Sequence, residues 1–103
     1  WTIENKSLWI LNSIGKYKPI TAGFVTEDCL ITNAKVLVYR EQIGYEIKYP
    51  KFTNQLLGAK LRDDLKLVNN IDNISGATLS VRSMDRMTRA ALLLNSVKDK
   101  NCN

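Results

Sequence analysis

The sequence predicts an α+β fold, in which a small antiparallel β-sheet packs against a C-terminal α-helix and one short helix. Two observations carry this prediction. The first part of the chain groups β-branched and other apolar residues into short runs separated by turn residues. The last part spaces its apolar residues by three and four positions, which is the period of an amphipathic helix. Strands followed by helices are typical of the α+β class.

Three strands are expected in succession. Residues 8–14 form a short apolar run that ends at a turn over residues 15–19. Residues 20–26 continue with β-formers, residues 27–28 mark a second turn, and residues 30–39 alternate polar and apolar side chains. Because consecutive strands joined by short turns pair with each other, we expect an antiparallel meander.

The middle of the chain predicts less regular structure. Pro50 disfavours a helix that passes through Tyr49, so residues 51–57 are expected to form a separate short helix that Gly58 stops. Residues 60–73 have no clean period and contain several asparagines, which predicts a loop with at most one short strand.

The clearest element is the last, an amphipathic helix of about fifteen to twenty residues that starts near Leu79. Its methionines are expected to pack in the core rather than to bind a cofactor. Asp85 and Arg89 have the spacing of a helical ion pair. The apolar face is formed by Val81, Met84, Met87, Ala91 and Leu94.

Length and composition limit the possible functions. The 103 residues predict a single domain over 1–103 with one core, and the sequence contains no histidine. Histidine-based acid–base catalysis, histidine-activated nucleophiles and histidine metal sites are therefore excluded. We predict neither a catalytic residue nor a metal site in this chain.

Charge, cysteines and hydropathy add weaker indications. The formal charge of +5 suits an anionic partner, although the basic residues are spread along the chain. Cys29 and Cys102 are compatible with one disulfide in an exported protein or with two thiols in a cytosolic one. The longest apolar run, residues 90–94, is far shorter than the ~20 residues of a membrane span.

A short motif before the last helix, residues 72–80, has the character of an anion site. Glycine lets the backbone approach a ligand closely, and hydroxyl groups there stand beside the free N–H groups of a helix start. A phosphate at such a place also gains from the helix dipole. The alternative, that the hydroxyl residues only cap the helix, stays open. The residues concerned are Ser75, Gly76, Ala77, Thr78 and Ser80.

The same motif carries a family resemblance. Asp72-x-x-Ser75-Gly76-Ala77-Thr78 resembles the flavinylation motif D-x-x-[ST]-G-A-[ST] of the FMN-binding domain family, found in the Na⁺-translocating NADH:quinone oxidoreductase, in Rnf complexes and in exported flavoproteins. Four upstream elements also resemble the family in order and spacing: Lys18-Pro19-Ile20, the hairpin from Thr26 to Val38, Glu41-x-x-Gly44 and Phe52-x-x-Gln55-Leu56-x-Gly58. Two positions depart from it, because Lys18 replaces a common glycine and Gln42 a common threonine.

The resemblance implies a covalent FMN cofactor. In the family, a separate Mg²⁺-dependent transferase that uses FAD as donor esterifies the last hydroxyl of the motif, here Thr78, to the FMN phosphate. Glu41 and Gly44 are expected near the flavin on this ground only, and ordinary surface and turn roles stay open for them. Asp72 serves either the transferase or an Asx turn. The expected cofactor-binding residues are Thr78, Ser75, Gly76, Ala77, Leu79, Ser80, Asp72, Glu41 and Gly44.

The implied function is a redox carrier, or a domain of an oxidoreductase, rather than a stand-alone enzyme. Its expected partners are the FMN transferase and redox proteins, with room for a membrane-associated complex. The family further implies an extracytoplasmic location, and a chain that begins at Trp1 suggests a processed product or a piece of a longer protein. One alternative is a reductase that binds FMN reversibly. Another is a basic module for polyanions, although no motif for nucleic acid supports it.

Overall fold

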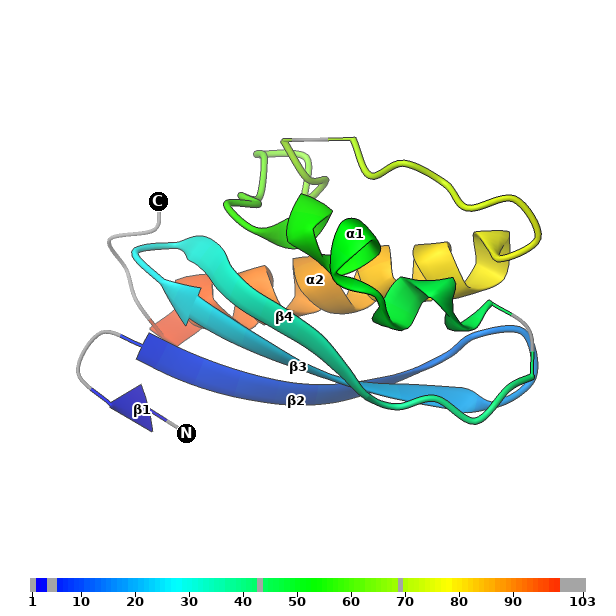
Figure 1. The fold of residues 1–103 in the computed structure, drawn as a ribbon. Helices are drawn as coiled ribbons and strands as arrows, with labels where there is room; N and C mark the ends of the chain where they lie inside the picture. Colours follow the sequence, from blue (N-terminus) through cyan, green and yellow to red (C-terminus); the bar gives the residue numbers. More distant parts are fainter. Residues whose placement is uncertain (1, 4–5, 43, 69, 99–103) are drawn as a thin grey trace.

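The computed structural model describes residues 2–3, 6–42, 44–68 and 70–98. The long helix α2, Thr78–Lys98, lies along one face of an antiparallel sheet whose strands follow in the order β1–β2–β3–β4 (Figure 1). This arrangement confirms the predicted α+β class. The strands are β1, Thr2–Ile3; β2, Lys6–Ile14; β3, Pro19–Glu27; and β4, Leu30–Val38. Along the chain, three short helical elements follow β4 and precede α2: η1, Tyr45–Lys48; α1, Pro50–Thr53; and η2, Asn54–Leu56.

The turn between β3 and β4 lies one residue later than predicted. Asp28 and Cys29 have φ angles of 52° and 68°, and they separate the paired residues Glu27 and Leu30. Two successive left-handed residues form the kind of tight turn that matches the twist of a hairpin. Cys29 is disulfide-bonded rather than a free thiol. Cys102, the other cysteine of the sequence, lies outside the described residues.

The inward side chains of the sheet follow the predicted alternation, except at a β-bulge near the start of β4. Ile20 and Phe24 on β3 are completely buried, as expected for alternate residues on one face. On β4 the buried residues Ile31 and Ala34 are three apart because the pairing register shifts between Val25 and Thr26. An extra residue in β4 at this bulge keeps both side chains on the core side.

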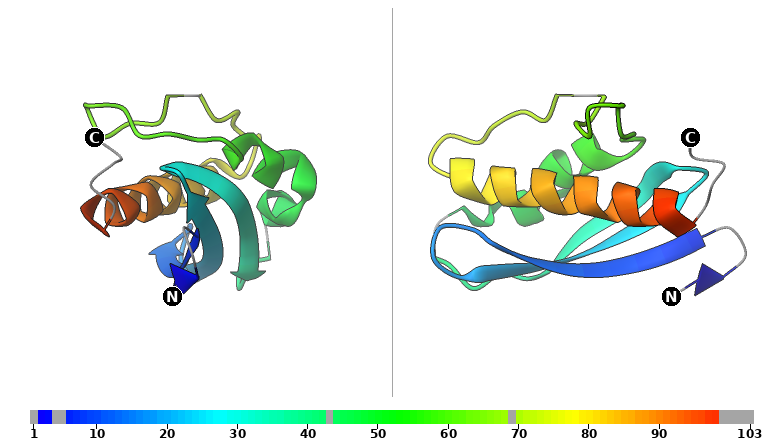
Figure 2. Two further views of the ribbon diagram at one scale, coloured as in Figure 1. Left: turned by 90° about the vertical axis from the view of Figure 1, so that its left-hand side faces the viewer. Right: turned by 180° about the vertical axis from the view of Figure 1, so that it is seen from behind.

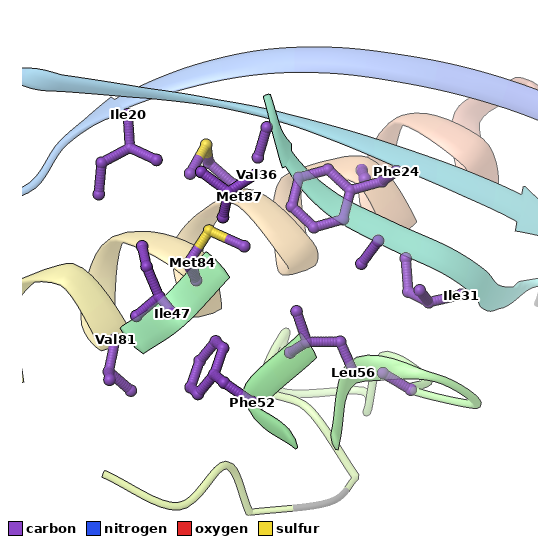
Figure 3. Packing of buried hydrophobic residues seen from close by; sticks show 14 of the residues in the cluster. Ile20, Phe24, Ile31, Val36, Ile47, Phe52, Leu56, Val81, Met84 and Met87 are labelled. Atoms are coloured by element: carbon purple, nitrogen blue, oxygen red, sulfur yellow. The ribbon is translucent and has the colours of Figure 1, made fainter. Parts of the chain in front are cut away.

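The apolar face of α2 fills the core, as Figure 3 shows. Met84 and Met87 are 0% and 2% exposed and pack among the strand residues, which confirms their predicted structural role. Phe52 and Leu56, from the short helices, close the core from the other side (Figure 3). Leu94, which was predicted on the same face, is 41% exposed.

Polar contacts fix the far end of α2 to the sheet. The Trp9 Nε1–H group donates to Thr26 Oγ1 at 2.9 Å, and Thr26 Oγ1 lies 2.8 Å from Asn95 Oδ1. Lys98 Nζ donates to Ser7 Oγ at 2.8 Å. These contacts explain why the helix has 21 residues, one more than the upper end of the predicted range. It also starts one residue before Leu79.

The connecting segments differ from the predictions in detail. The predicted helix over 51–57 is α1 followed by η2, and it begins at Pro50, a residue well suited to the first helical position. The strand considered within 60–73 is a single bridge between Leu61 and Leu67. Strand β1 and helix η1 were not predicted. No helix among the described residues is long and apolar enough to cross a membrane.

Candidate functional site

Three segments meet at the end of the molecule opposite the β3–β4 turn: the β2–β3 turn, the segment after β4 and the start of α2 (Figure 1, right). Together they surround an open cleft of about 530 Å³, which we name the hairpin cleft. Most of the predicted site residues gather here. The lining residues are Lys16, Tyr17, Lys18, Glu41, Gln42, Gly76, Ala77, Thr78, Leu79 and Ser80.

Thr78 is the first residue of α2 and lies at the edge of this cleft. The side-chain amide of Asn73 donates a hydrogen bond to Thr78 Oγ1 at 3.0 Å. That bond uses a lone pair of the oxygen and leaves the hydroxyl hydrogen for another acceptor. Asn73 therefore orients the threonine without consuming its proton.

The backbone before Thr78 is shaped for a helix start. Gly76 has a φ angle of 82°, a conformation that glycine adopts without steric cost. The buried Ala77 follows, and its carbonyl accepts the Val81 N–H group at 2.9 Å, the first bond of the helix. The N–H groups of the first turn have no partner within a helix, so they and the helix dipole favour an anion beside Thr78.

Glu41 holds the opposite wall of the hairpin cleft. Its carboxylate accepts hydrogen bonds from three consecutive backbone N–H groups, those of Lys16 at 3.0 Å, Tyr17, and Lys18 at 2.9 Å. Partial burial raises the pKa of Glu41, but these three bonds and the charge of Lys16 outweigh it. The net result is a pKa below the ordinary value of 4.5.

This lowered pKa predicts a specific acid sensitivity. A carboxylate whose pKa is lower in the folded protein stabilises the fold fully above pH 4.5, and this contribution disappears as the pH falls through the folded-state pKa. The stability difference between the wild type and Glu41→Gln should therefore be constant near neutrality and shrink below about pH 4.5. Urea unfolding between pH 3 and pH 7 measures it.

Asp63→Asn provides the control for this experiment. Asp63 is an exposed carboxylate that makes no hydrogen bond or ion pair within the described part of the chain. Its variant should follow the wild-type stability curve across the same range. A Glu41→Gln difference that does not shrink in acid would contradict the bracing role of Glu41.

Gly44 lies behind the cleft rather than in its lining. It is buried with a φ angle of 89°, and a β-carbon built on it would come within 2.6 Å of the Tyr39 hydroxyl and 3.1 Å of Ser80 Oγ. Those two oxygens are themselves 3.0 Å apart and share a hydrogen bond. Gly44 thus lets the segment after β4 pack directly against the first turn of α2.

Two other predicted residues also lie outside the hairpin cleft. Asp72 is exposed, and its backbone N–H group donates to Gln55 Oε1 at 2.8 Å. Ser75 is exposed as well. The sequence analysis missed two residues of this site, Asn73 and Tyr17. Asn73 lies within the motif and could have been found there. Tyr17 is far from the motif in sequence, and only the folded β2–β3 turn brings it to the site.

A second open cleft, of about 700 Å³, lies on the other side of Thr78, between α2 and the segment before it. We name it the basic cleft. Thr78 lines both clefts and so stands on the boundary between them. The lining residues are Arg62, Lys66, Leu67, Asn70, Ile71, Asn73, Thr78, Val81, Arg82, Asp85 and Arg89.

An α+β fold with an open cleft and an anion-favouring helix start defines a small ligand-binding module. Comparison with protein-family models identifies the ligand class, because the model of the FMN-binding domain matches residues 15–93. This match covers most of the chain, which therefore belongs to the FMN-binding domain family and is a flavin-binding module of the electron-transfer kind. A search of curated proteins found no match.

The hairpin cleft fits FMN in size and in chemistry. Its volume of about 530 Å³ is within the usual range for small-molecule sites. Tyr17, a residue that is 78% exposed, and Leu79 provide aromatic and apolar surface for a flat ring. The start of α2 provides N–H groups for the phosphate.

Proposed function

We propose that Thr78 carries FMN through a phosphoester and that the chain is a redox carrier in an extracytoplasmic electron-transfer chain. The observation that supports this proposal is the position of Thr78. Its hydroxyl lies at the first residue of α2, on the edge of the hairpin cleft, in the position that the flavinylation motif assigns to the acceptor. FMN supplies the electron chemistry when bound.

Attachment is a phosphoryl-group transfer to Thr78. The Thr78 oxygen forms a new bond to the FMN-side phosphorus of FAD, the bond between the two phosphates breaks, and AMP leaves. The hydroxyl proton needs a base. Among the residues that the structure describes, Glu41 is the only carboxylate that lines the hairpin cleft, and its oxygens already accept hydrogen bonds from three N–H groups. The base is therefore expected from the Mg²⁺-dependent transferase.

The chain itself offsets the charge of the ester phosphate. The N–H groups and dipole at the start of α2 contribute about 0.3–1 kcal/mol for an exposed anion. Arg82 follows Thr78 by four residues, so both side chains lie on one face of the helix, and both line the basic cleft. Arg82 is the first basic residue of α2 after the acceptor.

A covalent tether suits the shape of the hairpin cleft. The cleft is open, and such a site releases a non-covalent ligand easily. Tethering the phosphate makes capture of the ring an intramolecular event, with an effective concentration on the order of millimolar. An open cleft then becomes an advantage, because electron donors and acceptors reach the ring edge in turn.

Intact mass spectrometry tests this function. Wild-type protein co-produced with an FMN transferase should gain the mass of one FMN minus one water, and the flavin should stay on the protein in a denaturing gel. Protein produced without the transferase should show neither signal. A fluorescent native protein that loses its flavin on denaturation would instead support the reversible FMN-binding reductase and overturn the tether.

A further inference from the structure

We propose that the basic cleft is the docking site for an acidic surface of the redox protein that exchanges electrons with the flavin. This inference rests on the proposed attachment of FMN to Thr78. It concerns different residues, however, and it makes a prediction for the protein without flavin.

The location of the basic cleft is the first reason. The segment between α1 and α2 passes above α2, beside the half of the helix that begins at Thr78 (Figure 2, right). The cleft lies between these two elements, and Thr78 separates it from the hairpin cleft. A partner seated in the basic cleft would therefore lie next to the flavin attachment point without occupying the flavin cleft.

The charge of the lining is the second reason. Four basic side chains, Arg62, Lys66, Arg82 and Arg89, face one acidic side chain, Asp85. Two of the cations are neutralised locally: Arg89 lies 3.6 Å from Asp85, and Arg62 lies 3.2 Å from Asp64.

Lys66 and, in the protein without flavin, Arg82 keep their full charge toward a partner, because neither has an ion pair within the described residues. Such an imbalance in a concave surface attracts anions and raises the rate of association with acidic partners. Part of the net charge of +5 is thus concentrated in the basic cleft, where it would attract an acidic partner.

The spread of the cations indicates a protein surface rather than a small phosphate. The side chain of Arg62 is 55% exposed, and Lys66 and Arg82 are exposed as well. They come from two separate elements around a cleft of about 700 Å³, which is much larger than a single phosphate. Several carboxylates on one partner surface would match this distribution.

Chemical-shift mapping on the protein without flavin provides the first test, with hexaglutamate and inorganic phosphate as probes. At low ionic strength, hexaglutamate should shift backbone amides in residues 61–68 and 78–89, and salt should abolish these shifts. Phosphate at the same concentration should leave them unchanged. Two outcomes would overturn the proposal. One is that hexaglutamate shifts the amides of all lysines and arginines equally. The other is that phosphate saturates the basic cleft and hexaglutamate does not displace it.

Oxidation kinetics on the flavin-loaded protein provide the second test. Each reduced flavin gives two electrons to two ferricyanide ions, which become ferrocyanide, and two protons are released. Lys66→Glu should slow this reaction by about threefold or more at low salt, because it reverses a charge beside the site. The same variant should speed oxidation by a cationic acceptor, hexaammineruthenium(III).

Lys35→Glu is the matched control for the kinetic test. Lys35 is exposed on β4 and pairs with Gly23, on the side of the sheet away from the buried Ala34. Its charge reversal should leave both rates near those of the wild type. Equal effects of the two variants would overturn the docking site, whereas absence of the flavin adduct would instead count against the proposed function.

Discussion

Replacing Thr78 by valine is expected to abolish covalent flavin attachment while the protein still folds. Valine keeps the branched shape of threonine but has no hydroxyl to esterify. The variant also loses the exposed hydrogen bond from Asn73 to Thr78 Oγ1, which costs about 1 kcal/mol. Intact mass after co-production with the transferase should show only the unmodified chain, against a fully or largely modified wild type.

Hydroxyl controls make this result specific to Thr78. Thr78→Ser retains a hydroxyl at the same place and should still accept FMN. Ser75→Ala and Ser80→Ala remove the neighbouring hydroxyls, and both variants should keep the adduct. Ser75 lies outside the hairpin cleft, and Ser80 Oγ already shares a hydrogen bond with the Tyr39 hydroxyl. An adduct that persists in Thr78→Val would show that FMN is attached to another residue and would contradict the proposed role of Thr78.

The second large effect is expected for Gly44→Ala, which should destabilise the fold by about 2–3 kcal/mol. A left-handed conformation costs a non-glycine residue about 1–2 kcal/mol, and the new β-carbon would approach the Tyr39 hydroxyl to 2.6 Å. Tyr39 must then move and weaken its bond to Ser80, a further cost of about 1 kcal/mol. Thermal unfolding should show a Tm lower by about 10 °C or more.

Gly58→Ala separates the two contributions to this effect. Gly58 also has a positive φ, 78°, but a β-carbon there would have no atom within 4 Å. Its variant therefore carries only the conformational cost, about 1–2 kcal/mol. The Gly44 variant should in addition accept FMN more slowly, because it disturbs the first turn of α2. Equal loss in both variants, with unchanged flavinylation, would contradict the packing role of Gly44.

Local patterns predicted the elements of the fold well. The β-strand runs, the methionines of the core and the Asp85–Arg89 ion pair, now seen at 3.6 Å, are all encoded in residues a few positions apart. The end of α2 was harder to predict because distant residues fix it. Asn95 reaches Thr26, 69 positions away, and Lys98 reaches Ser7, 91 positions away.

The same distinction applies to the candidate site. The stretch from Gly76 to Ser80 is contiguous, so the motif alone predicted a helix start with the character of an anion site. The environment of Glu41 depends on backbone groups 23 to 25 positions earlier. The family resemblance predicted that Glu41 lies near the flavin, but only the folded structure shows that its carboxylate accepts hydrogen bonds from the backbone of the β2–β3 turn.

The hydrogen bonds of Glu41 to the β2–β3 turn also make the two sides of the hairpin cleft different for an anion. Three consecutive N–H groups in a turn form a natural anion receptor, and the chain has filled this receptor with its own carboxylate. A phosphate placed at the turn would meet the negative charge of Glu41, and the three backbone N–H groups there already donate to that carboxylate. The opposite rim, at the start of α2, keeps its N–H groups. FMN attached to Thr78, as we propose, would therefore place its phosphate toward the helix and its ring toward the hairpin.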